Sequence, residues 1–124
     1  MGILSQIQLL KSQGKKGMAI LLDPDKIPEE EFNSLAQRLE SSGVDFVFVG
    51  GSLLMNNQLP KLVQALKEVV TLPTVLFPGN VYQICPDADG ILFLSLISGR
   101  NPEMLIGQHV VAAPLLKQSN LEVL

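Results

Sequence analysis

Four short polar segments each follow an apolar run, and together they could build a ligand-binding site. They are Asp23-Pro24-Asp25-Lys26, Gly50-Gly51-Ser52, Pro78-Gly79-Asn80 and Ser98-Gly99-Arg100-Asn101. Ligand-binding groups collect at the carboxyl ends of parallel strands, because the loops there are free to vary. If the apolar runs are such strands, the four segments offer a carboxylate, a hydroxyl, an amide and a guanidinium to one rim.

Asp23 is the candidate for binding a cation at this rim. Mg²⁺ commonly takes one or two carboxylates, and waters and substrate phosphate oxygens complete its coordination. Asp23 could instead cap the turn that Pro24 initiates, and its position does not separate the two roles. Asp25 and Lys26 either belong to the rim or form a solvated ion pair.

The other rim residues each have a functional and a structural interpretation. Ser52 follows two glycines, so its hydroxyl lies where the backbone can approach a ligand closely, or it serves as a turn or N-cap serine. Arg100 could bind a phosphate bidentately, or it could lie at a solvated helix start. The candidate contacts to substrate are Lys26, Asn80 and Arg100.

No residue of the sequence stands out as a general base, so the catalytic residue is left unassigned. His109 is expected on a helix with no acid or cysteine placed to orient it, and we interpret it as structural. Cys85 is expected in a loop without an activating base.

Short apolar runs and amphipathic stretches alternate along the chain and must position these segments. Strands are predicted at 18–22, 46–49, 74–77 and 91–96, with a fifth beginning at Leu121. The first of these has the length and composition of a strand buried on both faces. Helices are predicted over 1–11, from Phe32 to near Gly43, from Pro60 onward and through 105–110.

This order, a helix followed by four strand–helix units and a further strand, places the chain in the α/β class. Short connections predict neighbouring parallel strands with right-handed crossovers. A small open sheet fits this order, and so does part of a (βα)8 TIM barrel, which needs roughly 200–250 residues when complete. We expect residues 1–124 to form one unit that ends early.

Composition narrows the expected partners and location. The 124 residues carry a net charge of −3 without a cluster of lysine and arginine, so no nucleic-acid partner is expected. No apolar run approaches the ~18 residues of a transmembrane helix, and no signal peptide is expected. The single cysteine, Cys85, favours a reducing, cytoplasmic location.

Taken together, the motifs resemble the geranylgeranylglyceryl phosphate synthase family. The resemblance begins with Leu22-Asp23-Pro24-Asp25-Lys26 and Val49-Gly50-Gly51-Ser52. It continues, in order, through Phe77-Pro78-Gly79-Asn80, residues 94–101 and Ile106-Gly107-Gln108-His109. It implies a modified (βα)8 barrel that joins a prenyl diphosphate to sn-glycerol 1-phosphate through an ether bond, with Mg²⁺ assistance, in phospholipid biosynthesis. By this likeness, Asp23 and Ser52 match the family's metal positions.

The chain also departs from the family pattern. Some relatives have a lysine that touches glycerol phosphate two residues before the metal aspartate, and this chain has Leu21 there. The family's glycerol-phosphate loops, with their tyrosine, glutamate and glycine-rich turns, belong to the second half of the barrel and are absent here. We therefore expect the chain to be the first half of such a barrel, with four strands and the start of a fifth.

The expected function is that of a Mg²⁺-dependent prenyltransferase whose metal-holding half is this chain. Its expected partners are a prenyl diphosphate, sn-glycerol 1-phosphate, a second copy of the chain and, peripherally, a membrane. An alternative is a non-catalytic half-barrel that self-associates or binds a phosphorylated ligand. Another phosphate-handling barrel enzyme with the same layout is a further alternative.

Overall fold

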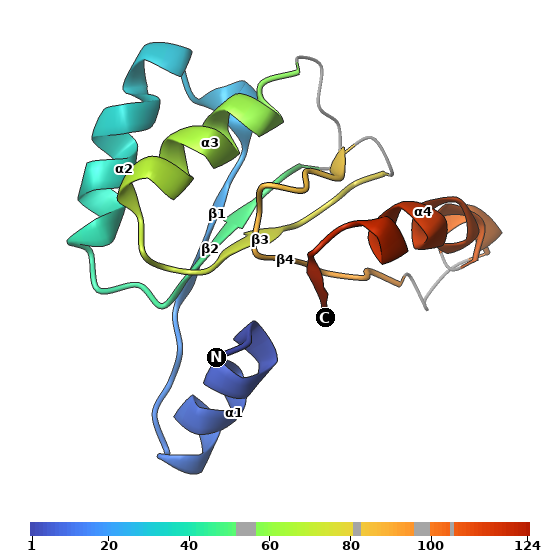
Figure 1. Ribbon diagram of the computed structural model, residues 1–124, viewed down its shortest axis with the longest axis horizontal. Coiled ribbons are helices and arrows are strands. Elements are labelled where there is room, and N and C mark those ends of the chain that lie inside the picture. The colour runs from blue at the N-terminus through green and yellow to red at the C-terminus, as the bar shows by residue number, and fades with distance from the viewer. Residues whose placement is uncertain (52–56, 81–82, 96–99, 105) are drawn as a thin grey trace.

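A parallel β-sheet forms the centre of the protein. The computed structural model describes residues 1–51, 57–80, 83–95, 100–104 and 106–124. The five strands are adjacent in chain order (Figure 1) and comprise β1 (Ala19–Leu22), β2 (Phe46–Val49), β3 (Thr74–Leu76), β4 (Gly90–Ile91) and β5 (Glu122–Val123). All four neighbouring pairs are parallel, which confirms the predicted strand order and orientation.

Helices precede the sheet and connect its strands. They are α1 (Ile3–Ser12), α2 (Phe32–Glu40), α3 (Leu59–Val69) and α4 (Gly107–Gln118), with 3₁₀ turns η1 (Pro24–Lys26), η2 (Glu29–Glu31) and η4 (Pro102–Met104). Helices α2 and α3 lie together over one face of the sheet, and α1 lies apart from them near the other end of β1 (Figure 1). Within the described part of the chain, no helix has the length and apolar character that crossing a bilayer requires.

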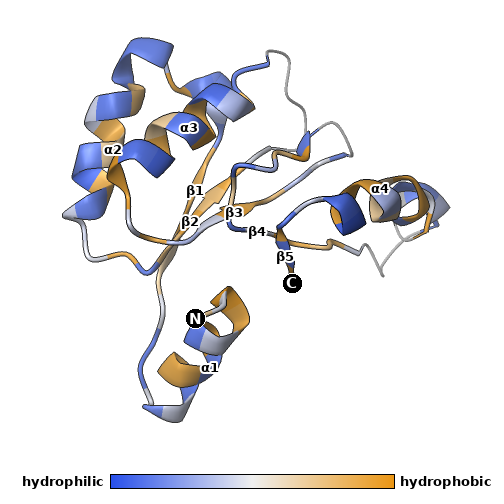
Figure 2. Ribbon diagram, viewed as in Figure 1, coloured by the Kyte–Doolittle hydropathy of each residue, from blue (hydrophilic) through white to orange (hydrophobic). Residues whose placement is uncertain are grey.

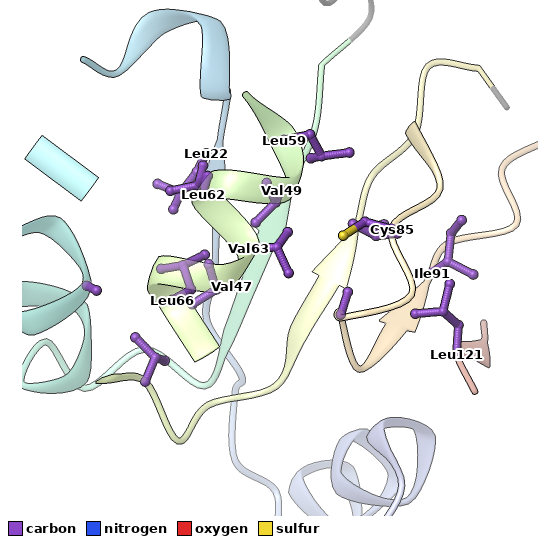
Figure 3. Close-up of a cluster of buried hydrophobic side chains, with 14 of the residues drawn as sticks. Leu22, Val47, Val49, Leu59, Leu62, Val63, Leu66, Cys85, Ile91 and Leu121 are labelled. Atoms are coloured by element: carbon purple, nitrogen blue, oxygen red, sulfur yellow. The ribbon is translucent and has the colours of Figure 1, made fainter. Parts of the chain in front are cut away.

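The main core lies between the sheet and helices α2 and α3 (Figure 3). Figure 2 shows hydrophobic residues along the strands and hydrophilic ones on the outer turns of α2. The amphipathic pattern of α3 explains its place, because three apolar residues on one face point into the core. These are Leu62, Val63 and Leu66, which pack with Val47, Val49 and Leu76 of the strands.

Strand β1 is less buried than predicted. Of its four residues only Leu22 is buried, whereas Ile20 is 37% and Leu21 51% exposed. The prediction of a strand covered on both faces is wrong: three of its four residues are exposed, so the described residues cover neither face of β1 fully. β1 also forms an edge of the sheet, with β2 as its one described neighbour. The apolar run indicated a strand correctly but not how its faces are covered.

Strand β4 is shorter than the predicted strand 91–96 and ends at Ile91. Main-chain bonds continue past it, from Leu92 N–H to Leu76 O at 3.0 Å and from Phe93 N–H to Leu124 O at 2.8 Å. Pairing with β5 covers only two residues of each strand, so the ladder ends early. Leu96, the predicted last residue of this strand, lies outside the described residues.

Aspartates fix the amino ends of two strands. The Asp45 carboxylate accepts the Met18 N–H at 2.8 Å, and the Asp89 carboxylate accepts the Thr74 N–H at 2.7 Å. The main-chain N–H of each aspartate donates in turn to the carbonyl of the same partner, at 2.8 Å in both cases. These paired bonds set the start of each ladder.

Glu122 links the two ends of the chain. Its carboxylate accepts the Ile3 N–H at 2.6 Å and the Leu4 N–H at 3.0 Å, so a residue of β5 caps the N-terminus of α1. The N–H groups of Leu4 and Ile3 stabilise the charged form and lower the pKa of Glu122 below its ordinary value. A negative charge at a helix N-terminus also interacts favourably with the helix dipole.

We expect Glu122→Gln to lower the thermal midpoint of unfolding near neutral pH. Because the folded-state pKa is lowered, the carboxylate stabilises the fold above its unfolded-state pKa, and this contribution is lost as pH falls through the folded-state pKa. Thermal unfolding of both proteins over a pH series tests this. The difference between wild type and variant should shrink in acid, whereas Glu68→Gln, at an exposed position on α3, should change little throughout. A difference that is independent of pH would contradict the assignment.

Candidate functional site

The carboxyl ends of the parallel strands form one rim, as the sequence predicted. Asp23 follows β1, Gly50 and Gly51 follow β2, and Pro78 to Asn80 follow β3. Ser52 lies outside the described residues. The predicted pairing of Asp23 with Ser52 around one ion therefore stays a prediction.

Asp23 caps the turn that follows it, and its second carboxylate oxygen meets no donor among the described residues. Its Oδ1 accepts the Asp25 N–H at 3.0 Å, which makes Asp23 the N-cap of η1. Oδ2 accepts no hydrogen bond from the described residues, and the side chain is only partly buried. Turn capping and cation binding were alternatives at the sequence level, and the geometry accommodates both.

A hollow of about 590 Å³, open to solvent, lies beside Asp23. Lys26, Arg38 and the backbone of Gly50 and Gly51 also line it. Over the described ranges, no three His, Cys, Asp or Glu side chains gather in a way that could hold a metal ion. The described lining fits a Mg²⁺ ion that is bound through one protein carboxylate, with phosphate and water oxygens as its other ligands. It does not fit an ion that is held by protein side chains alone.

Two glycines hold the rim of β2 close to β3. Gly50 N–H donates to Leu22 O at 3.0 Å, and Gly50 has a φ of +152°, which side chains rarely tolerate. A Cβ at this position would collide with the main-chain oxygen of Phe77. The turn after β2 therefore needs glycine, both for its backbone conformation and for the close approach of β3.

Gln83 is a site residue that the sequence analysis missed. It is 2% exposed, its Nε2 donates to Gly51 O at 2.7 Å, and its Oε1 accepts the Gly51 N–H at 3.3 Å. Both bonds reach 32 residues back along the chain, so no local pattern around Gln83 could have indicated them.

The residues predicted to contact substrate do not all lie at one site. Lys26 shares the hollow beside Asp23, whereas Asn80 lines a different pocket of about 80 Å³ between the ends of β3 and β4 and helix α4. The lining of this second pocket is largely apolar, with Leu92, Phe93 and Ala112 among its residues. Arg100 is exposed and lines neither the hollow nor this pocket.

His109 and Cys85 make packing contacts. The His109 ring stacks on Phe93 with centroids 4.1 Å apart, and its Nε2 lies 2.6 Å from Leu94 O, so it joins α4 to the chain after β4. This arrangement is of the structural kind predicted for His109. Burial raises the pKa of the Cys85 thiol, which opposes formation of a reactive thiolate.

Comparison with known proteins gives a consistent family match. A family model described as the PcrB family matches residues 10–124. A geranylgeranylglyceryl phosphate synthase from Chitinophaga pinensis is 48% identical over 114 residues, covering 92% of this chain and 45% of the relative. A synthase of the same name from Flavobacterium johnsoniae is 50% identical over 119 residues, covering 96% of this chain and 49% of the relative. The chain thus spans about half the length of the curated relatives it matches.

Solved structures match over the whole chain. The (S)-3-O-geranylgeranylglyceryl phosphate synthase from Thermoplasma acidophilum, in complex with its substrate sn-glycerol-1-phosphate, matches with a TM-score of 0.90 and 32% identity. The match covers 100% of this chain and 50% of the Thermoplasma chain. The corresponding synthase from Thermoplasma volcanium matches with a TM-score of 0.90 and 33% identity. The sheet and helices described above therefore correspond to half of a TIM barrel.

We expect Gly50→Ala to destabilise the fold by about 2–5 kcal/mol, because it adds a collision with Phe77 O to the cost of the backbone conformation. Gly43→Ala is the matched control. Gly43 also has a positive φ, of +80°, but an added Cβ there meets nothing within 4 Å, so only about 1–2 kcal/mol should be lost. Urea unfolding measures both, and equal losses would contradict the tight packing of the rim.

Proposed function

Because this chain belongs to the PcrB family, we propose that it supplies the metal-holding rim of a prenylglyceryl phosphate synthase. Such an enzyme joins a prenyl diphosphate to sn-glycerol 1-phosphate through an ether bond, in phospholipid biosynthesis. The observation that carries the proposal is Asp23, whose second carboxylate oxygen meets no donor among the described residues and lies beside an open hollow at the carboxyl end of β1. This end of a barrel sheet is where TIM-barrel enzymes place their active sites.

We assign Asp23 and Ser52 to Mg²⁺. The ion would supply Lewis-acid stabilisation of the negative charge that grows on the diphosphate as it leaves the prenyl carbon. The Asp25 N–H holds Asp23 Oδ1, so the carboxylate is oriented before any ligand arrives. Lys26 lines the same hollow and would offset the remaining charge of the diphosphate.

The apolar pocket under α4 is suited to part of the prenyl chain. Its volume is about 80 Å³, below the roughly 300–1,000 Å³ of most small-molecule sites, so it would take only a short section of that chain. Its aliphatic and aromatic lining can bury a hydrocarbon, and Asn80 contributes a polar group to it. We assign Asn80 as a further substrate contact. Arg100 stays a substrate contact predicted from the sequence alone, since it lines neither the hollow nor this pocket. Handling such a lipid also implies peripheral contact of a cytoplasmic enzyme with a membrane.

We also propose that the chain forms a homo-oligomer, and the exposed edge strand β1 supports this. An edge strand with apolar side chains tends to pair with another strand. The same observation favours the alternative of a non-catalytic half-barrel that self-associates.

We expect sedimentation velocity to show concentration-dependent association of the chain, and Ile20→Lys to weaken it. A lysine on an edge strand opposes pairing with a second strand. Gln37→Lys adds the same charge at an exposed position on α2 and should leave association unchanged. Association that is equally strong in both variants would rule out the β1 edge as the contact.

The proposed reaction is tested with labelled geranylgeranyl diphosphate and sn-glycerol 1-phosphate. The proteins compared are this chain, its fusion to the second half of the Chitinophaga relative, and that relative itself. We expect ether product from the fusion and from the relative. Product from the relative but not from a folded fusion would defeat the proposal.

Asp23→Asn in the fusion should lower the rate by roughly 100- to 1,000-fold, because the variant can still cap η1 but loses the charge that holds the metal. Glu30→Gln removes an exposed carboxylate from the nearby loop and should leave the rate unchanged. A wild-type rate in the Asp23 variant would remove that residue from the proposed metal site.

A further inference from the structure

Gln83 is buried although its side chain is a polar carboxamide. Among the described residues, the buried polar side chains are Thr74 and Gln83, and they differ in what they contact. Thr74 Oγ1 has no hydrogen-bond partner, whereas both ends of the Gln83 carboxamide are bonded to one residue, Gly51. A buried amide is costly unless both its donor and its acceptor are satisfied, so this arrangement is specific.

The Gln83 carboxamide takes the place of a neighbouring strand at Gly51. The β2–β3 pairing includes the bond from Phe77 N–H to Val49 O at 2.8 Å. Two residues beyond Val49, the N–H and the C=O of Gly51 are both bound by the Gln83 side chain. A primary amide has the same donor and acceptor groups as a peptide unit, so it can continue the pairing beyond the bond between Phe77 and Val49.

The Gly50–Gly51 turn is held from two sides. Phe77 O lies so close to Gly50 that no Cβ fits, and Gln83 Oε1 would lie 3.3 Å from such a Cβ. Gln83 Nε2 also holds the main-chain oxygen of Gly51, so one side chain binds both main-chain polar groups of this glycine. Gly50 and Gly51 line the hollow beside Asp23, and Gln83 therefore fixes the backbone on that side of the hollow.

We propose that Gln83 is a positioning residue for the metal-binding rim: its carboxamide holds the Gly51 backbone that lines the hollow beside Asp23. This inference rests on the proposed function, which assigns Asp23 to Mg²⁺ and the diphosphate to this hollow. Removing a side chain that holds a metal ligand in place typically weakens metal binding by about 10- to 100-fold. Gln83 makes no contact with substrate in this scheme and acts only through Gly51.

The test compares Gln83→Met with Thr74→Val in the 124-residue chain. Methionine is unbranched and similar in length to glutamine, so it removes both hydrogen bonds with little change in packing. Thr74→Val removes an equally buried polar group that has no partner, and should be neutral or slightly stabilising. Gln83→Asn keeps the carboxamide on a shorter side chain and serves if the methionine variant does not fold.

Two measurements are made on each folded variant. Hydrogen exchange of the Gly51 amide by NMR reports the bond to Gln83 directly and needs no ligand. Binding of Mn²⁺ with inorganic pyrophosphate, followed by water proton relaxation, reports the rim, because Mn²⁺ prefers the same oxygen ligands as Mg²⁺. We expect Gln83→Met to speed Gly51 exchange by about tenfold and to weaken Mn²⁺–pyrophosphate binding by about 10- to 100-fold. Thr74→Val should change neither.

The outcomes separate this inference from the proposed function. Unchanged Gly51 exchange in Gln83→Met, or faster exchange with unaltered Mn²⁺–pyrophosphate binding, would overturn the positioning role. A wild-type chain that binds no Mn²⁺–pyrophosphate would instead overturn the proposed metal site and the link of Gln83 to it. The exchange measurement would still decide whether Gln83 orients Gly51.

Discussion

The parallel pairing of the strands is the constraint on which the rest of the structure depends. In a parallel sheet, all strands begin at one end and finish at the other, so residues far apart in sequence meet at a common rim. Asp45 and Asp89 set where β2 and β4 start relative to β1 and β3, and Gly50 sets how closely β3 follows the end of β2. Because side chains alternate between faces, a shift of one residue would turn the core residues of a strand away from α2 and α3.

Carboxylates have different roles at the two ends of the sheet. Main-chain N–H groups at the start of a strand or helix need an acceptor from outside that element. Asp45, Asp89 and Glu122 each accept such groups, from the β-strands or from α1. Their negative charge is thereby committed to the fold. At the other end Asp23 accepts one N–H through Oδ1 only, and its second oxygen faces no donor among the described residues. The same side-chain type is structural at one end and remains available for a ligand at the other.

Features that depend on neighbouring residues in sequence were predictable, and those that depend on distant ones were not. The amphipathic spacing of α3, the Pro24 turn after β1 and the order of strands all follow from local patterns, and the structure confirms them. The exposure of Ile20 was not predictable from its own segment, because it depends on what packs over the face of the sheet that Ile20 occupies. The position of Asp23 was predicted from the end of its strand. The role of Gln83 was hidden, since a glutamine in a loop has many possible partners and only the folded chain selects Gly51.

The contrast between Gly51 and Asp23 suggests how such a rim can be both fixed and open. A main-chain group at the end of a strand must find a partner, and a buried one left unpaired costs roughly as much as a lost hydrogen bond. Gln83 meets this need for both groups of Gly51 without adding a charge. A carboxylate in its place would be a second negative group at this rim and could not donate to Gly51 O. A neutral amide therefore holds the backbone while leaving the charge of the rim to Asp23, Lys26 and the ligand that they would bind.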